Sequence, residues 1–599
     1  MNAAENTQGR HDMKKRHLRR RPVPALGSIL VGASMAGFGG HASLAAAPSD
    51  PAAACAGLAT LAKFPVTPTQ ITLAKFNPAG TTSSNGMALP EHCQVQGIIN
   101  KRTGVDGFPY GASFEVRLPT PAQWNGRFMF QGGGGTEGAV PPATGAAGTL
   151  SPTLAHGWAV ASQDGGHENK DLPTPHQFFL DPQAVTDHAY GSIDVTAQTA
   201  KFLIDAYYGQ APDRSYFVGC STGGRQGMVF SQNFPDYFDG IVAGDPVYDL
   251  EAIALGEDWG VKAIEAITPA PIEKLPDGSP VLYPALPVAD QNLVTSAILA
   301  ACDGLDGTVD GVVDNLGGAC WAKFDPATFV FPQTGQPLQC TGAKTATCLS
   351  AAQIDAVKKI NRGPRNALGQ PIKAPASMAA REHVDNVVFG YPYDGGFMAA
   401  TGIPSRKIGA PTSGPGDFAL GLGQIPYIWM TPVNPGFNPL RFDFDKDIAS
   451  LNKSTPLVTY SASTDISKFR ERRGKIIWYH GVSDPGPSVH GTIEYYKQLA
   501  ARNGGLQETQ AFARLFLVPN MGHCRGGPAT DQFDMLTPLV SWVEQGNAPD
   551  KVVASGTRFT SPPTTRSRPL CPYPQEARYT GAAGGDLGAA TNYACMMPK

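Results

Sequence analysis

The sequence lacks an apolar run long enough to cross a membrane, and it carries little charge. A spanning helix needs about 20 consecutive apolar residues, and the apolar stretch near the N-terminus, at 25–38, is shorter than that. Charged residues make up 16% of the 599 positions, the formal net charge is -3, and no basic block follows the N-terminus. Such a balance gives no electrostatic footprint for nucleic acid or an anionic membrane surface, so we expect a small-molecule partner.

The sequence also lacks Cys-x-x-Cys pairs, which structural zinc sites commonly use, so zinc is not expected. It does hold 10 cysteines, and an even count in an exported protein indicates disulfide bonds. Cys220 and Cys524 lie far apart in the chain. The other eight form close pairs that suggest local bridges, although spacing does not fix the pairing: Cys55–Cys93, Cys302–Cys320, Cys340–Cys348 and Cys571–Cys595.

The N-terminus has the three parts of an export signal. A basic segment at 14–21 precedes the apolar stretch at 25–38, and small residues at 43–48 offer a cleavage site. We predict a signal peptide at 1–47 and a secreted or periplasmic mature protein, with a short membrane anchor as the alternative. Adjacent arginines at 19–21 are compatible with the twin-arginine route.

Short apolar, β-rich runs alternate with longer helical stretches over much of the mature chain. The runs lie at 126–131, 158–163, 215–219, 240–244, 475–481 and 514–519. Because they are apolar throughout, they suit strands buried on both faces of a parallel sheet, and we predict an α/β fold. The rhythm breaks where proline, glycine and cysteine accumulate. We predict a catalytic domain built from 48–247 and 467–599, with a lid domain at 248–466 inserted into it.

A candidate nucleophile follows one of these runs. The pattern Gly219-x-Ser221-x-Gly223 comes after the run at 215–219 and before a predicted helix, which is the strand-turn-helix setting of a nucleophile elbow. Small flanking residues let a strained turn lift the serine hydroxyl above the sheet, and the following helix N-terminus favours negative charge there. Since the chain contains 69 glycines, an ordinary glycine-rich turn is the alternative.

A serine hydroxyl needs a base, and the base needs an orienting carboxylate. Asp484 lies just past the run at 475–481, and His523 lies just past the run at 514–519. The chain order Ser, Asp, His is that of the α/β-hydrolase fold. The alternatives are a loop histidine and a turn-forming aspartate, and the rival carboxylates are Asp465, Asp531 and Asp534.

Two cysteines stand beside the predicted serine and histidine. If the Ser221 hydroxyl bonds to the His523 imidazole, the neighbouring Cys220 and Cys524 come within the roughly 4.4 to 6.8 Å between Cα atoms that a disulfide tolerates. Such a bridge would tie the elbow to the histidine loop. Two unrelated buried thiols are the alternative.

An oxyanion hole needs two backbone N–H donors. Thr222, the residue after the predicted nucleophile, would supply one. The other would come from the glycine-rich turn at 132–135, with Gly135 as the first choice and Gly134 as the second. An ordinary flexible loop is the alternative.

One loop, at 302–315, carries four aspartates among glycines: Asp303, Asp306, Asp310 and Asp314. Carboxylates are hard oxygen ligands that suit calcium, although this spacing is not that of an EF-hand. A solvated, turn-rich loop is the alternative.

Many separate blocks, in one order, resemble the tannase and feruloyl esterase family of secreted α/β-hydrolases. They include LPEHCQVQG, SYFVGCSTGGRQGM, CDGLDGTVDGVVDN, ARLFLVPNMGHC and LCPYPQEARY. The resemblance implies Ser221 as nucleophile, Asp484 and His523 as its relay, and a Cys220–Cys524 disulfide. An α/β-hydrolase fold with a large inserted lid domain is implied as well.

The resemblance also implies a structural calcium ion in the aspartate loop. Its ligands would be the side chains of Asp303, Asp306 and Asp310 and the backbone carbonyls of Thr308 and Val312. Asp314 falls outside that set.

We therefore expect a secreted serine esterase that cleaves esters of aromatic carboxylic acids through an acyl-enzyme. Feruloyl or galloyl esters are the first expected substrates, and mono(2-hydroxyethyl) terephthalate competes with them. A catalytically silent binding protein on the same fold is the alternative from another class, since fold alone does not give function. A peptidase is a third hypothesis, and the sequence indicates neither the alcohol moiety nor the oligomeric state.

Overall fold

A computed structural model describes most of the chain after residue 49. The described residues are 50–81, 86–145, 152–248, 250–274, 280–314, 320, 324–372, 424–451, 455–484, 486–559, 562–582 and 584–598. They belong to one compact unit, Ala46–Lys599. The predicted signal peptide at 1–47 lies outside the described residues, and the division into catalytic and lid domains stays a prediction. No helix in the described ranges has the length and apolar character that a membrane span requires.

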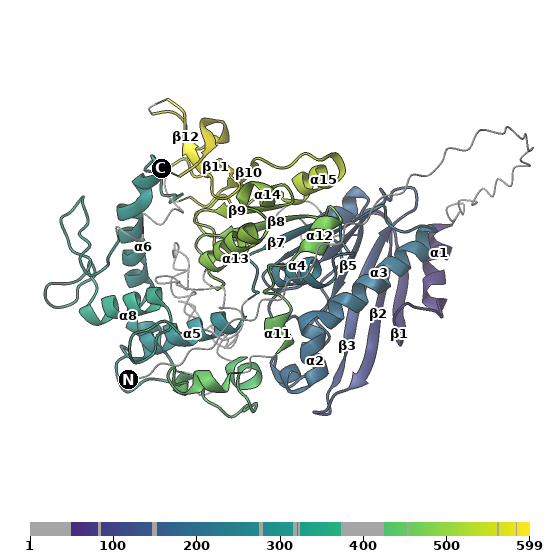
Figure 1. Cartoon of the computed structure of the whole chain (residues 1–599), viewed down its shortest axis with the longest axis horizontal. Helices are drawn as coiled ribbons and strands as arrows, with labels where there is room; N and C mark the ends of the chain where they lie inside the picture. Colours follow the sequence, from purple (N-terminus) through teal and green to yellow (C-terminus); the bar gives the residue numbers. More distant parts are fainter. Residues whose placement is uncertain are drawn as a thin grey trace, which may run out of the picture. The chain divides into compact units, whose positions relative to one another are not determined.

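A nine-stranded mixed sheet forms the centre of this unit (Figure 1). In spatial order the strands run β1-β2-β3-β5-β4-β6-β7-β8-β9. The first three pair antiparallel, β3 also pairs antiparallel with β5, and the strands from β5 to β9 in this order are parallel. The bounds are β1 (Thr69–Asn77), β2 (His92–Thr103), β3 (Pro109–Pro119), β4 (Arg127–Gln131), β5 (Ala159–Gln163), β6 (Arg214–Cys220), β7 (Gly240–Gly244), β8 (Lys475–Gly481) and β9 (Ala513–Val518).

The six strands expected from apolar runs, β4 to β9, are confirmed, and so is their parallel pairing. Successive residues point to opposite faces of a strand, and both faces are buried here. In β6, Phe217 joins the apolar cluster on one face and Tyr216 the cluster on the other. Ile476 and Ile477 divide in the same way in β8, which explains why these runs are apolar throughout.

Helices cover both faces of the parallel strands. Apolar residues of α3, α4 and α13 belong to the first cluster, and those of α15 belong to the second. The helices are α1 (Pro51–Gly57), α2 (Pro182–Thr186), α3 (Ser192–Tyr208), α4 (Thr222–Asn233), α5 (Leu250–Glu265), α6 (Val288–Cys302), α8 (Ala351–Arg362), α11 (Pro456–Thr459), α12 (Ser467–Glu471), α13 (Val489–Arg502), α14 (Leu506–Gln510) and α15 (Leu536–Gln545). Because β6, β8 and β9 run parallel, their C-terminal ends lie at the same edge of the sheet.

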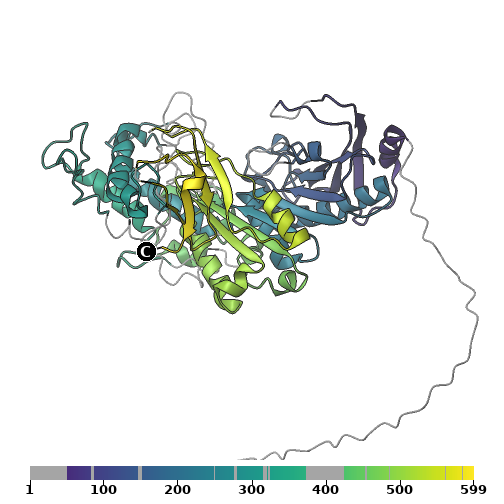
Figure 2. The same cartoon turned by 90° about the horizontal axis from the view of Figure 1, so that it is seen from above.

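The segment predicted as a lid contains α5, α6 and α8. In both views these teal helices lie away from β1 to β3, beyond the parallel strands (Figures 1 and 2). Val294 and Ile298 of α6 and Ile354 and Val357 of α8 belong to the same apolar cluster as the sheet. The segment is therefore packed onto the catalytic part by a continuous core.

Three N-terminal strands and two C-terminal hairpins were not expected from the sequence. β2 buries alternate residues over much of its length, a weaker pattern than a continuous apolar run. The hairpins pair β10 (Val552–Gly556) with β11 (Arg566–Leu570) and β12 (Glu576–Tyr579) with β13 (Tyr593–Met596). Disulfides close the four local cysteine pairs as proposed: Cys55–Cys93, Cys302–Cys320, Cys340–Cys348 and Cys571–Cys595.

Candidate active site

Ser221 sits on a sharp turn between β6 and α4. Its backbone has φ 64° and ψ -123°, a strained conformation that L-residues rarely adopt. The glycines around it are needed for space. A Cβ at Gly219 would lie 2.7 Å from Gly223 Cα, and one at Gly224 would lie 2.2 Å from the Gly244 carbonyl oxygen. This geometry is that of a nucleophile elbow.

Asp484 and His523 lie together at the ends of β8 and β9. His523 Nδ1 donates to Asp484 Oδ2 at 2.7 Å, and the Gly486 N–H donates to the other carboxylate oxygen at 2.8 Å. The Asp484 side chain is 0% exposed and that of His523 is 33% exposed, so of the two only the histidine meets solvent. The rival carboxylates are engaged elsewhere: Asp465 pairs with Arg502, Asp531 with Arg558, and Asp534 accepts from the Leu536 N–H.

The charges of this pair support each other. Burial alone would disfavour the Asp484 anion, but the charge and hydrogen bond of His523 hold the pKa of that carboxyl below its ordinary value. Burial likewise disfavours protonated His523, and the Asp484 charge outweighs it, so the pKa of His523 stands above its ordinary value. The histidine is therefore a stronger base than a free imidazole.

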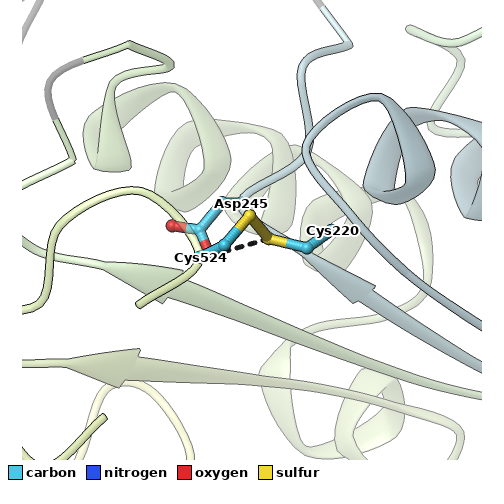
Figure 3. Close-up of side chains that lie close together, drawn as sticks. All are labelled: Cys220, Asp245 and Cys524. Carbon is cyan, nitrogen blue, oxygen red and sulfur yellow. Dashed lines mark hydrogen bonds between the residues drawn. A yellow bond between two sulfur atoms is a disulfide. The ribbon is translucent and has the colours of Figure 1, made fainter. Parts of the chain in front are cut away.

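Cys220 and Cys524 form a disulfide between the elbow and the histidine loop (Figure 3). Their Cα atoms are 6.0 Å apart, and the bridge joins positions separated by 304 residues. Within the described ranges no direct hydrogen bond joins Ser221 to His523. Catalytic hydrogen bonds commonly tighten only when substrate binds, and the bridge holds together the chain segments that carry the two residues.

The predicted oxyanion donors, Thr222 and Gly135, are adjacent. The Thr222 hydroxyl donates to the Gly135 carbonyl at 2.5 Å, which pins the glycine-rich turn to the first residue of α4. Gly135 has φ 58°, which glycine adopts without strain. Neither backbone N–H donates to another residue in the described part of the chain, as the prediction of two oxyanion donors requires.

A polar network behind the turn fixes it further. The Gly133 N–H donates to Gln226 Oε1 at 3.0 Å, and Gln226 Nε2 donates to Glu137 Oε1 at 2.5 Å. Gln163 Nε2 donates to the other oxygen of Glu137, while the Gly165 N–H donates to Gln163 Oε1. Burial raises the pKa of Glu137 to about 7, although the Arg225 charge and the two amides work against that. Sequence reasoning missed this network.

The aspartate loop has donor chemistry that suits calcium. Burial and neighbouring carboxylates raise the pKa of Asp303 and Asp306 above the ordinary value, a repulsion that a divalent cation would relieve. Among the described residues, however, no three carboxyl groups of this loop bring their oxygens within 4.8 Å of one another. Asp303 accepts from the Gly311 N–H at 2.9 Å, Asp306 accepts from the Thr308 N–H at 3.0 Å, and Asp310 pairs with Arg568. Binding an ion would require these carboxylates to turn inward.

The loop also touches the histidine loop. Asn520, three positions before His523, donates from Nδ2 to the Gly311 carbonyl at 2.6 Å and accepts from the Val313 N–H at 3.3 Å. Val312 is buried, and the Val312 N–H donates to Asp310 Oδ1 at 3.1 Å. The predicted metal loop is thereby joined to the chain that carries the predicted base.

One acidic residue at the site was not predicted. Asp245 is the first residue after β7, between the strands that carry Ser221 and Asp484, and it is 0% exposed. A position just past an apolar run is the signal that predicts Asp484, and Asp245 has the same signal after the run at 240–244. The sequence does not show that β7 lies between β6 and β8.

The sheet and the elbow define an enzyme of the α/β-hydrolase fold. Residues 93–596 match the sequence profile described as "Tannase and feruloyl esterase". The chain belongs to this family of carboxylic ester hydrolases, and the expected resemblance is confirmed.

Relatives and solved structures agree with this assignment. The chain is 42% identical to the mono(2-hydroxyethyl) terephthalate hydrolase of Piscinibacter sakaiensis, over 89% of this chain and 90% of that protein. It is 31% identical to a probable feruloyl esterase of Arthroderma benhamiae, over 80% and 82% of the two chains. The crystal structure of feruloyl esterase B from Aspergillus oryzae shares the fold with TM-score 0.69 and 23% identity, covering 91% of this chain and 100% of that one.

Proposed function

We propose that the protein is an exported serine esterase that hydrolyses esters of aromatic carboxylic acids through an acyl-enzyme. The named substrates of its relatives, terephthalate and ferulate esters, have an aromatic acid in common. Feruloyl and galloyl esters and mono(2-hydroxyethyl) terephthalate are the substrates to test first. One observation carries the proposal: the strained Ser221 elbow is covalently tied to the loop of a histidine that a buried carboxylate orients.

The proposed chemistry uses each residue at a stated atom. His523 Nε2 takes the Ser221 proton while Oγ bonds to the ester carbonyl carbon, and Asp484 holds Nδ1–H and the imidazolium charge. The N–H groups of Thr222 and Gly135 bind the oxyanion. Return of the proton to the alkoxy oxygen breaks its bond to carbon and releases the alcohol. Water, deprotonated by His523, then attacks the acyl carbon and frees the aromatic acid.

A substrate panel tests this proposal. We expect wild type to hydrolyse at least one of methyl ferulate, methyl gallate and mono(2-hydroxyethyl) terephthalate, and Ser221→Ala to lose on the order of 10³-fold or more in kcat. A serine-directed phosphonate should label Ser221 in wild type, as read by peptide mass spectrometry. Equal rates in wild type and Ser221→Ala would refute the assignment.

The other hypotheses make different predictions in the same assay. A silent binding protein would bind an aromatic ester without hydrolysing it, and no described feature of the relay favours that outcome. A peptidase would cleave the anilide analogues of the accepted esters, and we expect these to be inert.

We also propose that the aspartate loop binds one structural Ca²⁺ through Asp303, Asp306 and Asp310, together with the carbonyls of Thr308 and Val312. The mutual repulsion of these carboxylates, half-buried at Asp303 and buried at Asp306, supports this proposal. Export through the predicted signal at 1–47 is proposed with it. Support comes from the five disulfides, which suit an oxidising compartment.

A further inference from the structure

Asp245 lies at the centre of the proposed relay without a role in the chemistry above. Its N–H donates to the Tyr479 carbonyl at 2.8 Å, and Oδ1 accepts from the Gly481 N–H at 2.8 Å. Oδ2 lies 3.5 Å from Cys220 Sγ, in the disulfide with Cys524 (Figure 3). A disulfide sulfur carries no hydrogen, so this contact gives the carboxyl group no donor.

A second carboxyl group, that of Asp484, lies beside that of Asp245, and both side chains are 0% exposed. Atoms of Asp245, His480 and Asp484 lie within 4.8 Å of one another, and all three residues are buried. Two ionised carboxylates this close together, and away from water, repel each other strongly, and a proton on one of them removes the repulsion and allows a hydrogen bond between them. Asp484 is the carboxylate that pairs with His523, whose charge favours the Asp484 anion, so the proton belongs on Asp245.

The other groups that face Asp245 do not change this assignment. His480 Nε2 donates to the Pro487 carbonyl at 3.0 Å, since that oxygen only accepts, and Nδ1 accepts from the Thr492 hydroxyl at 2.9 Å. Both nitrogens are thus engaged, which argues against a metal ion here. Burial, followed by the Asp484 charge, raises the pKa of Asp245, although the N–H groups of Gly481 and Cys524 work against this rise. Burial lowers the pKa of His480 and raises that of Tyr479.

We propose that Asp245 is a neutral carboxylic acid whose O–H donates to Asp484, a positioning residue that orients the carboxylate toward His523 and limits the basicity of His523. This inference rests on the proposed serine esterase function. Asp484 would then receive hydrogen bonds from His523, Gly486 and Asp245, and its anion would stay ionised inside the protein. Asp245 keeps its proton throughout the cycle.

Two substitutions separate a neutral Asp245 from an ionised one. Asp245→Asn keeps a donor toward Asp484 and an acceptor for the Gly481 N–H, so we expect kcat within about threefold of wild type and an unchanged acidic limb in the pH profile of kcat/KM. Asp245→Ala removes the donor, and we expect kcat to fall roughly 10- to 100-fold with little change in KM. Without that donor, the Asp484 charge stabilises protonated His523 more strongly, so the acidic limb moves to higher pH.

A shift of the acidic limb to lower pH in both variants would overturn the proposal. If Asp245 were ionised, both substitutions would remove a negative charge near His523 and move the acidic limb to lower pH. If Asp245→Ala left both kcat and the acidic limb of the pH profile unchanged, the proposal would also be overturned. Asp239→Asn, at the other end of β7, is the matched control and should behave as wild type.

Infrared spectroscopy tests whether the Asp245 carboxyl group carries a proton, and it does not require substrate turnover. We expect the spectrum of Ser221→Ala minus that of Ser221→Ala/Asp245→Asn to show the carbonyl band of one protonated carboxylic acid near neutral pH. Its absence would overturn the inference even if the esterase activity holds and even if Asp245→Ala fails to fold. Conversely, activity that survives Ser221→Ala would refute the proposed function while leaving this measurement valid.

Discussion

Asp484 makes the most direct prediction at the scale of single residues. His523 must be neutral to accept the serine proton, so kcat/KM should rise with pH through a His523 pKa that the Asp484 charge holds above its ordinary value. In Asp484→Asn that charge is gone, and we expect the acidic limb to move to lower pH. The rate itself should fall by roughly 10³- to 10⁴-fold, because the amide no longer holds the required imidazole tautomer. The pH dependence of kcat/KM measures both effects.

Asp534→Asn is the control for that experiment. Asp534 accepts from backbone N–H groups at the start of α15, and an asparagine oxygen can do the same, so we expect a profile like that of wild type. If Asp484→Asn left the limb in place, a different carboxylate would have to orient His523.

The residues that the sequence predicted share a simple signal, a polar side chain just past an apolar run. That signal found Ser221, Asp484 and His523 because parallel strands bring their C-terminal ends to one edge of a sheet. It applied equally to Asp245, but "GDP" after a strand also suits an ordinary turn. Only the strand order, which places β7 between β6 and β8, shows that Asp245 meets Asp484.

At the scale of elements, the Cys220–Cys524 bridge fastens the elbow to the loop after β9. We expect Cys220→Ser/Cys524→Ser to lose roughly 2–5 kcal/mol of unfolding free energy, since the bridge joins positions 304 residues apart. We also expect kcat to fall, because the serine and histidine then move independently. Denaturant unfolding and steady-state kinetics measure the two effects.

The matched control is Cys340→Ser/Cys348→Ser. This bridge joins positions 8 residues apart in the segment predicted as a lid, so its loss should reduce stability less and leave kcat unchanged. A full kcat in the Cys220→Ser/Cys524→Ser protein would contradict a bracing role for the disulfide.

The turn that holds Gly135 gives a second prediction at this scale. The amide oxygens of Gln163 and Gln226 accept from the backbone N–H groups of Gly165 and Gly133, so both amide nitrogens must point at Glu137. In Glu137→Gln one donor faces another, and we expect a loss of about 1–3 kcal/mol in unfolding free energy and a lower kcat. Glu508→Gln, at an exposed position, is the control. Unchanged stability and kcat in Glu137→Gln would show that the network does not hold the turn.

The elements themselves were predictable in proportion to their burial. Strands covered on both faces, such as β6 and β8, have continuous apolar runs, and these identified the parallel sheet. β2 alternates buried and partly buried residues for much of its length, so it lacks the continuous apolar run that identified the parallel strands, although its partners β1 and β3 are its neighbours in the chain. The Glu137 network escaped for a different reason, since it joins residues of β5, α4 and the turn after β4, which are distant in the sequence.

At the scale of the whole molecule, the aspartate loop connects three regions. It follows α6 of the segment predicted as a lid, and Arg568 of the β10–β11 hairpin pairs with Asp310. The Ala577 N–H donates to Asp314 at 3.0 Å, and Asn520 binds the loop beside the predicted base. A change in this loop should therefore alter the stability of the whole protein rather than that of one segment.

Calcium titration of the melting temperature tests that connection. An ion that binds only the native state stabilises it by RT ln(1 + [L]/Kd), about 2.7 kcal/mol at 100 times Kd, so we expect saturating Ca²⁺ to raise Tm by a few degrees and EGTA to reverse the rise. In Asp306→Asn the response should shrink, because a charged ligand is lost while the side chain keeps its shape. Mg²⁺ should substitute poorly, since it demands shorter, octahedral contacts. If neither Ca²⁺ nor EGTA changed the Tm of wild type, Arg568 and the loop N–H groups would already satisfy these carboxylates. The loop would then hold the three regions together without a metal.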